Sequence, residues 1–113
     1  MSRTFDDERE QAYERKLALD HELAFKVAAR RNALLARWAA ARMQLDQRES
    51  DAYIAELVEA GALHDDPGAI VTRIMRDFLR RGAPIARPEV QSQLQTCTAR
   101  ARAEVVRGSL HQT

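Results

Sequence analysis

The residues that could carry acid–base, nucleophilic or metal chemistry are few and far apart. The three histidines, His21, His64 and His111, fall on separate segments, and Cys97 is the single cysteine. His21 stands between two acids, but no second ligand shares its face of a helix, which argues against a metal site. The four glycines are too dispersed for a phosphate-binding loop, and no serine, histidine and carboxylate form a nucleophilic set. We therefore predict no catalytic residues, no metal and no enzyme activity.

The distribution of charge is more informative. The net charge is only +1, yet the charges are segregated along the chain. Residues 1–22 hold 4 basic and 7 acidic groups, residues 23–45 hold 5 basic groups and no acid, and residues 46–66 hold 1 basic and 7 acidic groups. Blocks of opposite sign can pair when helices pack side by side. We interpret most of this pattern as pairing within the protein.

A row of cations in the basic block has two interpretations. Lys26, Arg30 and Arg37 lie within about 80° of one another around a helix, and such a row can bind a phosphate backbone. We favour pairing of the row with the acidic helix that follows Asp46, and keep nucleic-acid binding as the alternative. Phe25 is predicted to point away from the core, next to Lys26. The candidate secondary contact is therefore Phe25, Lys26, Arg30 and Arg37.

The elements that position these groups are predicted to be helices. The chain has 113 residues, enough for one domain, and its commonest residue types are good helix formers. An amphipathic stripe appears at spacings of four and seven residues: Leu23, Val27, Leu34, Trp38 and Leu45. The scarcity of β-branched runs excludes a parallel sheet. The fold class is predicted to be all-α.

Local capping signals mark the next two helices. Asp46, with an acid three residues later, resembles a capping box, and Gly61 is placed to end the helix that follows. Asp66 then precedes Pro67, the pattern of an N-cap followed by proline at the first helical position. The strongest amphipathic run of the chain follows, and Gly82 is expected to end it.

A fourth helix is predicted from Pro88, and Gly108 is expected to end it. Cys97 falls on its apolar stripe and is interpreted as a small buried hydrophobic residue. Short connections favour antiparallel neighbours, so the four helices are predicted to close into a bundle over residues 20–108. Residues 109–113 are predicted to fray.

Nothing in the sequence predicts contact with the interior of a membrane. No apolar run reaches the roughly 20 residues that a bilayer span needs. The first residues are polar and acidic, which is unlike a secretory signal. We therefore expect no membrane insertion and a cytoplasmic location.

Residues 1–19 do not share the core pattern. Phe5 stands alone among charged residues, and Tyr13 and Leu17 form a single pair one helical turn apart. An isolated helix of this length is marginal in water, so we predict an arm, flexible or partly helical when free, that docks as a continuous helix. The alternative is an N-terminal tail that has no function. The candidate partner-binding residues of the arm are Phe5, Asp6, Arg9, Glu10, Tyr13, Glu14, Arg15 and Lys16.

Residues 4–40 carry short motifs that resemble a known family. They include FDD from Phe5, AYE from Ala12, DHEL from Asp20 and, most specifically, ARRN-x-LL-x-x-WAA from Ala29. This segment is similar to the alphaproteobacterial ATPase inhibitor subunit zeta, with one additional residue between the first two motifs. Beyond residue 40 the similarity lies in the layout of the helices.

The resemblance implies a four-helix bundle that bears an N-terminal inhibitory arm. It implies binding to the catalytic head of the F-type ATP synthase, formed by its alpha, beta and gamma subunits. The arm would insert as a helix between catalytic subunits and block ATP hydrolysis, like the mitochondrial inhibitor protein. Phe5 and Tyr13 would supply apolar anchorage, and the charged residues of the arm would supply specificity. The resemblance also implies weak nucleotide binding, to which we assign no residues.

The expected setting follows from the same resemblance. The protein is expected to be cytoplasmic and peripheral on the ATP synthase at the inner membrane. A monomer is expected when the protein is free, because the bundle uses the apolar stripe of each helix. The alternative function is a small helical nucleic-acid-binding or adaptor bundle that uses Lys26, Arg30 and Arg37.

Overall fold

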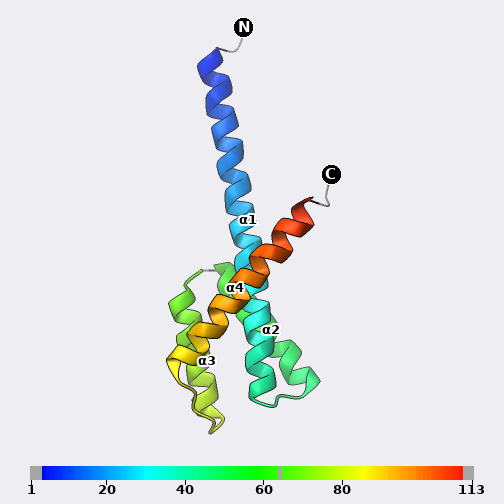
Figure 1. The fold of residues 1–113 in the computed structure, drawn as a ribbon, viewed down its shortest axis with the longest axis vertical. Coiled ribbons are helices and arrows are strands. Elements are labelled where there is room, and N and C mark those ends of the chain that lie inside the picture. The colour runs from blue at the N-terminus through cyan, green and yellow to red at the C-terminus, as the bar shows by residue number, and fades with distance from the viewer. Residues whose placement is uncertain (1–3, 64, 111–113) are drawn as a thin grey trace.

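The computed structural model describes residues 4–63 and 65–110, and these residues form four helices joined by short connections. The helices are α1 (Phe5–Arg42), α2 (Gln47–Leu63), α3 (Pro67–Arg80) and α4 (Arg87–Leu110). In Figure 1, α2, α3 and α4 gather around the C-terminal half of α1, and its N-terminal half projects away from them. No strand occurs among the described residues, so the prediction of an all-α fold is confirmed.

α1 runs without a break from the arm into the bundle. Thr4 caps it, because its Oγ1 accepts a hydrogen bond from the N–H of Asp7 at 3.2 Å. The sequence predicted an arm that is flexible or partly helical, whereas residues 5–19 are helical in the structure. The buried part of α1 provides a helical nucleus, and adding residues to an existing nucleus avoids the cost of nucleation. No break marks the predicted boundary between residues 19 and 20.

α1 ends before the last residue of its predicted stripe. The helix stops at Arg42, and the N–H of Leu45 donates to the carbonyl of Ala40 at 3.0 Å. Gln44 has a φ of 57°, the left-handed conformation typical of a residue just past a helix end. Leu45 therefore lies in the turn, partly buried against the core.

The predicted starts of α2 and α3 are confirmed. Oδ1 of Asp46 accepts from the N–H of Glu49 at 2.8 Å, and Oε1 of Glu49 accepts from the N–H of Asp46 at 3.3 Å. This is the reciprocal pattern of a capping box. Asp66 caps α3 by accepting from the N–H of Ala69 at 3.2 Å, and Pro67 is the first helical residue.

Only one of the three predicted helix-ending glycines has that role. Gly82, with a φ of 73°, follows α3 as predicted. Gly61 lies inside α2, and a Cβ there would stand 2.0 Å from Nδ2 of Asn32, so the close approach of α1 and α2 requires glycine. Gly108 lies inside α4, which continues to Leu110. The predicted frayed tail is thus helical at residues 109–110, and residues 111–113 lie outside the described part of the chain.

The core forms where the apolar faces of the four helices meet. Cys97 is buried among them, as predicted, and the rings of Trp38 and Phe78 lie 6.0 Å apart. α4 begins at Arg87, one residue before the predicted start. Each helix contributes a side chain with no exposed surface: Leu35, Leu57, Ile74 and Val90. Burial of such apolar surface is the main source of stability for a bundle of this kind.

The opposite charges pair within the protein, but between other helices than the sequence predicted. The acids of α2 pair with α3: Glu56 lies 3.0 Å from Arg73, and Glu49 lies 3.0 Å from Arg81. The predicted pairing of the basic row of α1 with α2 is therefore wrong. α2 packs closely against α1, but it presents these carboxylates toward α3, while Lys26 and Arg30 pair with Glu22 and Glu104.

Candidate partner-binding arm

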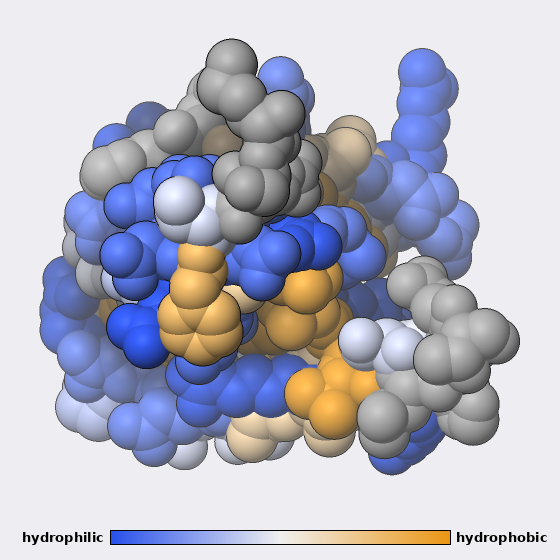
Figure 2. Space-filling model, turned by 90° about the horizontal axis from the view of Figure 1, so that it is seen from above, coloured by the Kyte–Doolittle hydropathy of each residue, from blue (hydrophilic) through white to orange (hydrophobic). Residues whose placement is uncertain are grey.

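The N-terminal half of α1 forms an exposed rod. The described protein measures 68 × 26 × 22 Å, and Figure 1 shows that α1 accounts for much of the long dimension. Two aromatic side chains of the arm are well exposed, Phe5 at 71% and Tyr13 at 66%. Large exposed apolar groups are characteristic of contact sites when they gather on a feature that projects from the core. Figure 2, which looks down on this end, shows hydrophobic groups as separate patches among hydrophilic ones.

Two arginines of the arm contact other groups of the same helix. The guanidinium of Arg9 lies over the ring of Phe5, 5.2 Å from its centre, a cation–π arrangement. Nε of Arg15 donates to the carbonyl of Gln11 at 3.3 Å. Asp6 lies in the first turn, where a carboxylate complements the positive end of the helix dipole. Glu10, Glu14 and Lys16 are exposed.

The two aromatic residues lie at different heights on one broad side of the arm. Tyr13 is eight positions after Phe5, which corresponds to about 12 Å along the axis and about 80° around it. Leu17 is one turn beyond Tyr13 and on the same side, with 38% exposure. A helix face of about 100° includes both rings, so this arrangement suits a groove that receives the arm along its length.

The four residues of the predicted secondary contact do not form one surface. Phe25 is 54% exposed, as predicted. Lys26 pairs with Glu22 on its own helix at 3.2 Å, and Arg30 pairs with Glu104 of α4. Arg37 is exposed and has no ion pair within residues 4–63 and 65–110. Because Lys26 and Arg30 pair with carboxylates of the protein itself, the alternative that this row binds nucleic acid is weakened.

One buried polar cluster was missed from the sequence. Arg31 is only 6% exposed, and the next residue, Asn32, is fully buried. Oδ1 of Asn32 accepts from both Nε and a terminal nitrogen of Arg31, at 3.0 and 2.9 Å, and Nδ2 donates to the carbonyl of Leu57 at 3.3 Å. Arg31 also pairs with Asp65 at 2.6 Å. The consecutive Arg and Asn within an apolar stripe were the available signal.

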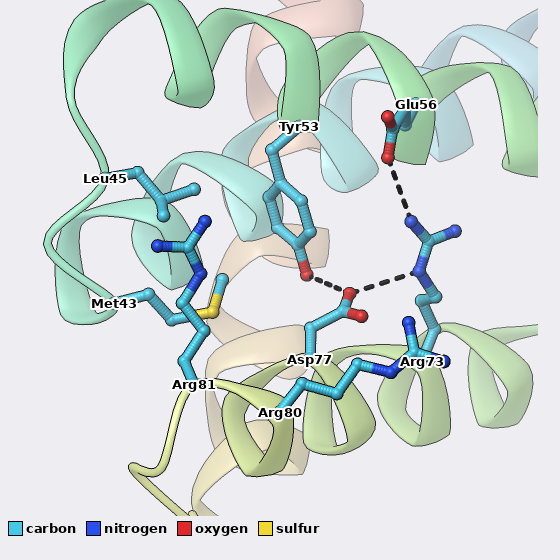
Figure 3. A pocket seen from close by; sticks show the side chains of 8 residues that line it. All are labelled: Met43, Leu45, Tyr53, Glu56, Arg73, Asp77, Arg80 and Arg81. Carbon is cyan, nitrogen blue, oxygen red and sulfur yellow. Dashed lines mark hydrogen bonds and ion pairs between the residues drawn. The ribbon is translucent and has the colours of Figure 1, made fainter.

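A second polar cluster lies between α2 and α3 and lines a pocket (Figure 3). The hydroxyl of Tyr53 donates to Asp77 at 2.8 Å, and Arg73 bridges Asp77 at 3.1 Å and Glu56 at 3.0 Å. Every charged group in this chain of contacts has a partner of opposite sign or a hydrogen bond. The arrangement joins α3 to α2 through side-chain contacts.

Ionisation in these clusters follows from their contacts. Burial, followed by the hydrogen bond to Asp77, raises the pKa of Tyr53, so the phenol stays protonated at physiological pH. The Arg81 guanidinium and then the backbone N–H of Asp46 hold the pKa of Glu49 below its usual value. Hydrogen bonds from Arg30 and Arg100 likewise lower the pKa of Glu104. The two carboxylate shifts favour the ion pairs of the bundle, and the shift of Tyr53 favours its hydrogen bond to Asp77.

Two further findings limit the chemistry that the described residues can do. Within residues 4–63 and 65–110, no group of three or more His, Cys, Asp or Glu side chains could hold a metal ion. Among the described helices, none combines the length and the apolar character of a membrane span. His64 and His111, considered above as ligands, lie outside the described residues.

Comparison with known proteins gives one match. The family ATPase inhibitor subunit zeta matches residues 2–104 of the chain, which covers the arm and most of the bundle. Neither a curated protein nor a solved structure matches the chain significantly.

Proposed function

The chain belongs to the ATPase inhibitor subunit zeta family, which supports a role as an inhibitor of ATP synthase, and we propose that its projecting arm is the inhibitory element. The observation that carries the proposal is the arm itself: a helix outside the bundle that exposes Phe5 and Tyr13. A bundle that only needed to fold would gain nothing from a long helix with two unburied aromatic rings.

The proposed mechanism is a steric brake on the rotary enzyme. The arm enters a cleft between alpha and beta subunits of the catalytic head, toward the gamma subunit, and stops rotation in the direction of ATP hydrolysis. Phe5 and Tyr13 anchor the arm at two points about 12 Å apart along its axis. A helix that is already formed loses less conformational entropy on binding than a disordered segment does.

We propose that the charged residues of the arm set its orientation in the cleft. Arg9 and Glu10 lie between the two aromatic anchors, and Glu14, Arg15 and Lys16 follow the second one. We propose that they pair with charges of the cleft walls and set the register of the arm. Asp6 takes part in this pairing at the N-terminal end of the arm. Nucleotide binding, which the resemblance implied, stays a prediction without assigned residues.

The experiment compares exposed apolar residues of the arm with exposed apolar residues elsewhere. The double variant Phe5→Ala/Tyr13→Ala removes both anchors, and Leu79→Ala/Val106→Ala removes two side chains of the bundle that are 66% and 55% exposed. We expect the first variant to need roughly tenfold or more protein for half-inhibition of ATP hydrolysis by the isolated head. The second should behave like the parent protein. Equal behaviour of both variants would refute the role of the anchors.

A further inference from the structure

Ion pairs join α1 and α4 near both ends of their contact, but within the described residues none joins them at its centre. At one end Arg30 pairs with Glu104, and at the other Arg42 pairs with Glu89 at 2.7 Å. These pairings make the two helices antiparallel, so Arg37 lies between the two ion pairs. No carboxylate within residues 4–63 and 65–110 pairs with Arg37. Arg37 lines a hollow to which α4 contributes Gln93, Thr96, Cys97 and Arg100.

A hollow of about 320 Å³ opens at this point, and we call it the seam hollow. Its apolar lining includes Leu34, Trp38 and Cys97, and its cations are Arg37 and Arg100. Leu34 and Cys97 are buried, each 7% exposed, whereas both arginines are exposed. The hollow therefore offers an apolar floor beneath a cationic rim.

The floor of the seam hollow is held in place from two sides. The ring of Trp38 packs 6.0 Å from the ring of Phe78, and the guanidinium of Arg42 lies 5.6 Å from the centre of the Trp38 ring. Arg42 is itself fixed by Glu89 at 2.7 Å. A preformed apolar floor costs little ordering when a partner side chain enters it.

The rim has an excess of positive charge. Glu104 is shared by two guanidinium groups, since Arg30 and Arg100 both contact it. Arg37 lines the same hollow as Arg100 and has no ion pair within residues 4–63 and 65–110, so the guanidinium groups along this contact outnumber the carboxylates. A guanidinium binds a carboxylate through two parallel hydrogen bonds, and such pairs gain both strength and direction. The group that best complements this rim is a carboxylate that arrives with an apolar neighbour.

We propose that the seam hollow receives an acidic amphipathic segment of the ATP synthase head. An apolar side chain of that segment packs on Trp38 and Cys97, and a carboxylate pairs with Arg37 and Arg100. The choice of partner rests on the proposed function. The choice of site rests on Arg37, which lies between two ion pairs and has no ion pair itself within the described residues. α1 is one helix, so a contact at Arg37 fixes the direction of the arm about 36 Å farther along, at Tyr13.

The first test measures the affinity of the full-length protein for the isolated head. Arg37→Glu should weaken binding roughly tenfold or more, because it places a carboxylate where the partner's carboxylate binds. Arg48→Glu is the matched control, since Arg48 is exposed on α2 and has no ion pair within the described residues. Circular dichroism of both variants checks that the helices are retained.

The second test identifies the occupant and uses a variant that keeps the charge. Arg37→Lys places a primary amine in the seam hollow, and a carbodiimide joins an amine to a carboxylate in direct contact as an amide. We expect a cross-link between this position and an Asp or Glu of a head subunit, located by mass spectrometry, and none from Arg48→Lys. A cross-link to a second copy of the chain, or none while the variant still binds the head, would overturn the proposal.

The outcomes separate this inference from the proposed function. If the parent protein inhibits the head and Arg37→Glu binds with unchanged affinity, the seam hollow is not a binding site. The proposed inhibitory role of the arm is then unaffected. If the parent protein neither binds nor inhibits the head, both proposals are wrong.

Discussion

Replacement of Gly61 by alanine tests how closely α1 and α2 are packed. An alanine in a helix is normally more favourable than glycine by about 0.5–1 kcal/mol. At Gly61 the added Cβ would stand 2.0 Å from Nδ2 and 3.3 Å from Cγ of Asn32. The amide must move, although Asn32 is fully buried and its side chain bonds to Arg31 and to the carbonyl of Leu57.

The expected magnitude follows from the contacts that the amide would lose. An unsatisfied buried amide costs about 1–3 kcal/mol, and overpacking costs about 1–3 kcal/mol more. After the gain in helix propensity, Gly61→Ala should lower the free energy of unfolding by about 1–5 kcal/mol. Urea denaturation followed by circular dichroism measures this difference.

A second glycine provides the control for the first. Gly108 also lies inside a helix, but a Cβ there would meet nothing within 4 Å. Gly108→Ala should therefore raise the free energy of unfolding by about 0.5–1 kcal/mol. The combination Asn32→Ala/Gly61→Ala removes the clashing amide, so Gly61→Ala should cost less in that background. Equal stabilisation by Gly61→Ala and Gly108→Ala would refute the close approach of the two helices.

Three other predictions concern the polar clusters and the arm. Tyr53→Phe removes the hydrogen bond to Asp77 and should lower the free energy of unfolding by about 0.5–1.5 kcal/mol in urea denaturation; no change would mean that the bond does not form. The pKa of Glu104 is lowered from 4.5 in the folded protein, so its contribution to stability is complete above the unfolded pKa and is lost as the pH falls through the folded pKa. The acid-induced loss of stability should be shallower in Glu104→Gln, and an identical pH profile would contradict the assignment. Ala12→Pro should interrupt the arm helix at a cost of about 3 kcal/mol to that helix and weaken inhibition, while thermal unfolding of the bundle changes little; full inhibition would show that an unbroken arm is unnecessary.

The features that could be predicted from the sequence depend on neighbouring residues. The caps at Asp46 and Asp66 are hydrogen bonds to residues three positions away, so the motif contains all that is needed. Gly82 ends α3 by its own left-handed conformation. The amphipathic stripes identified the core for the same reason, since their period depends only on the helix.

The features that could not be predicted depend on packing between helices. Gly61 resembles a helix end in the sequence, and only the approach of Asn32 reveals its role. Arg31 is a charged residue that a sequence places at the surface, but its contacts with Asp65 and Asn32 allow it to be buried. The partners of the basic row depended on which face each neighbouring helix turns toward it, since α2 packs against α1 but Arg30 pairs with Glu104 of α4. Whether the residues of the arm and of the seam hollow bind a partner remains a prediction.

The central claim is that the arm, and not the bundle, stops ATP hydrolysis. The most direct measurement follows ATP hydrolysis by the isolated head with the full-length protein and with a variant that lacks residues 1–19, after circular dichroism and thermal unfolding have shown that the shortened protein is folded. Inhibition by the full-length protein and its absence with the folded, shortened protein is the expected result. Full inhibition by the shortened protein would contradict the claim.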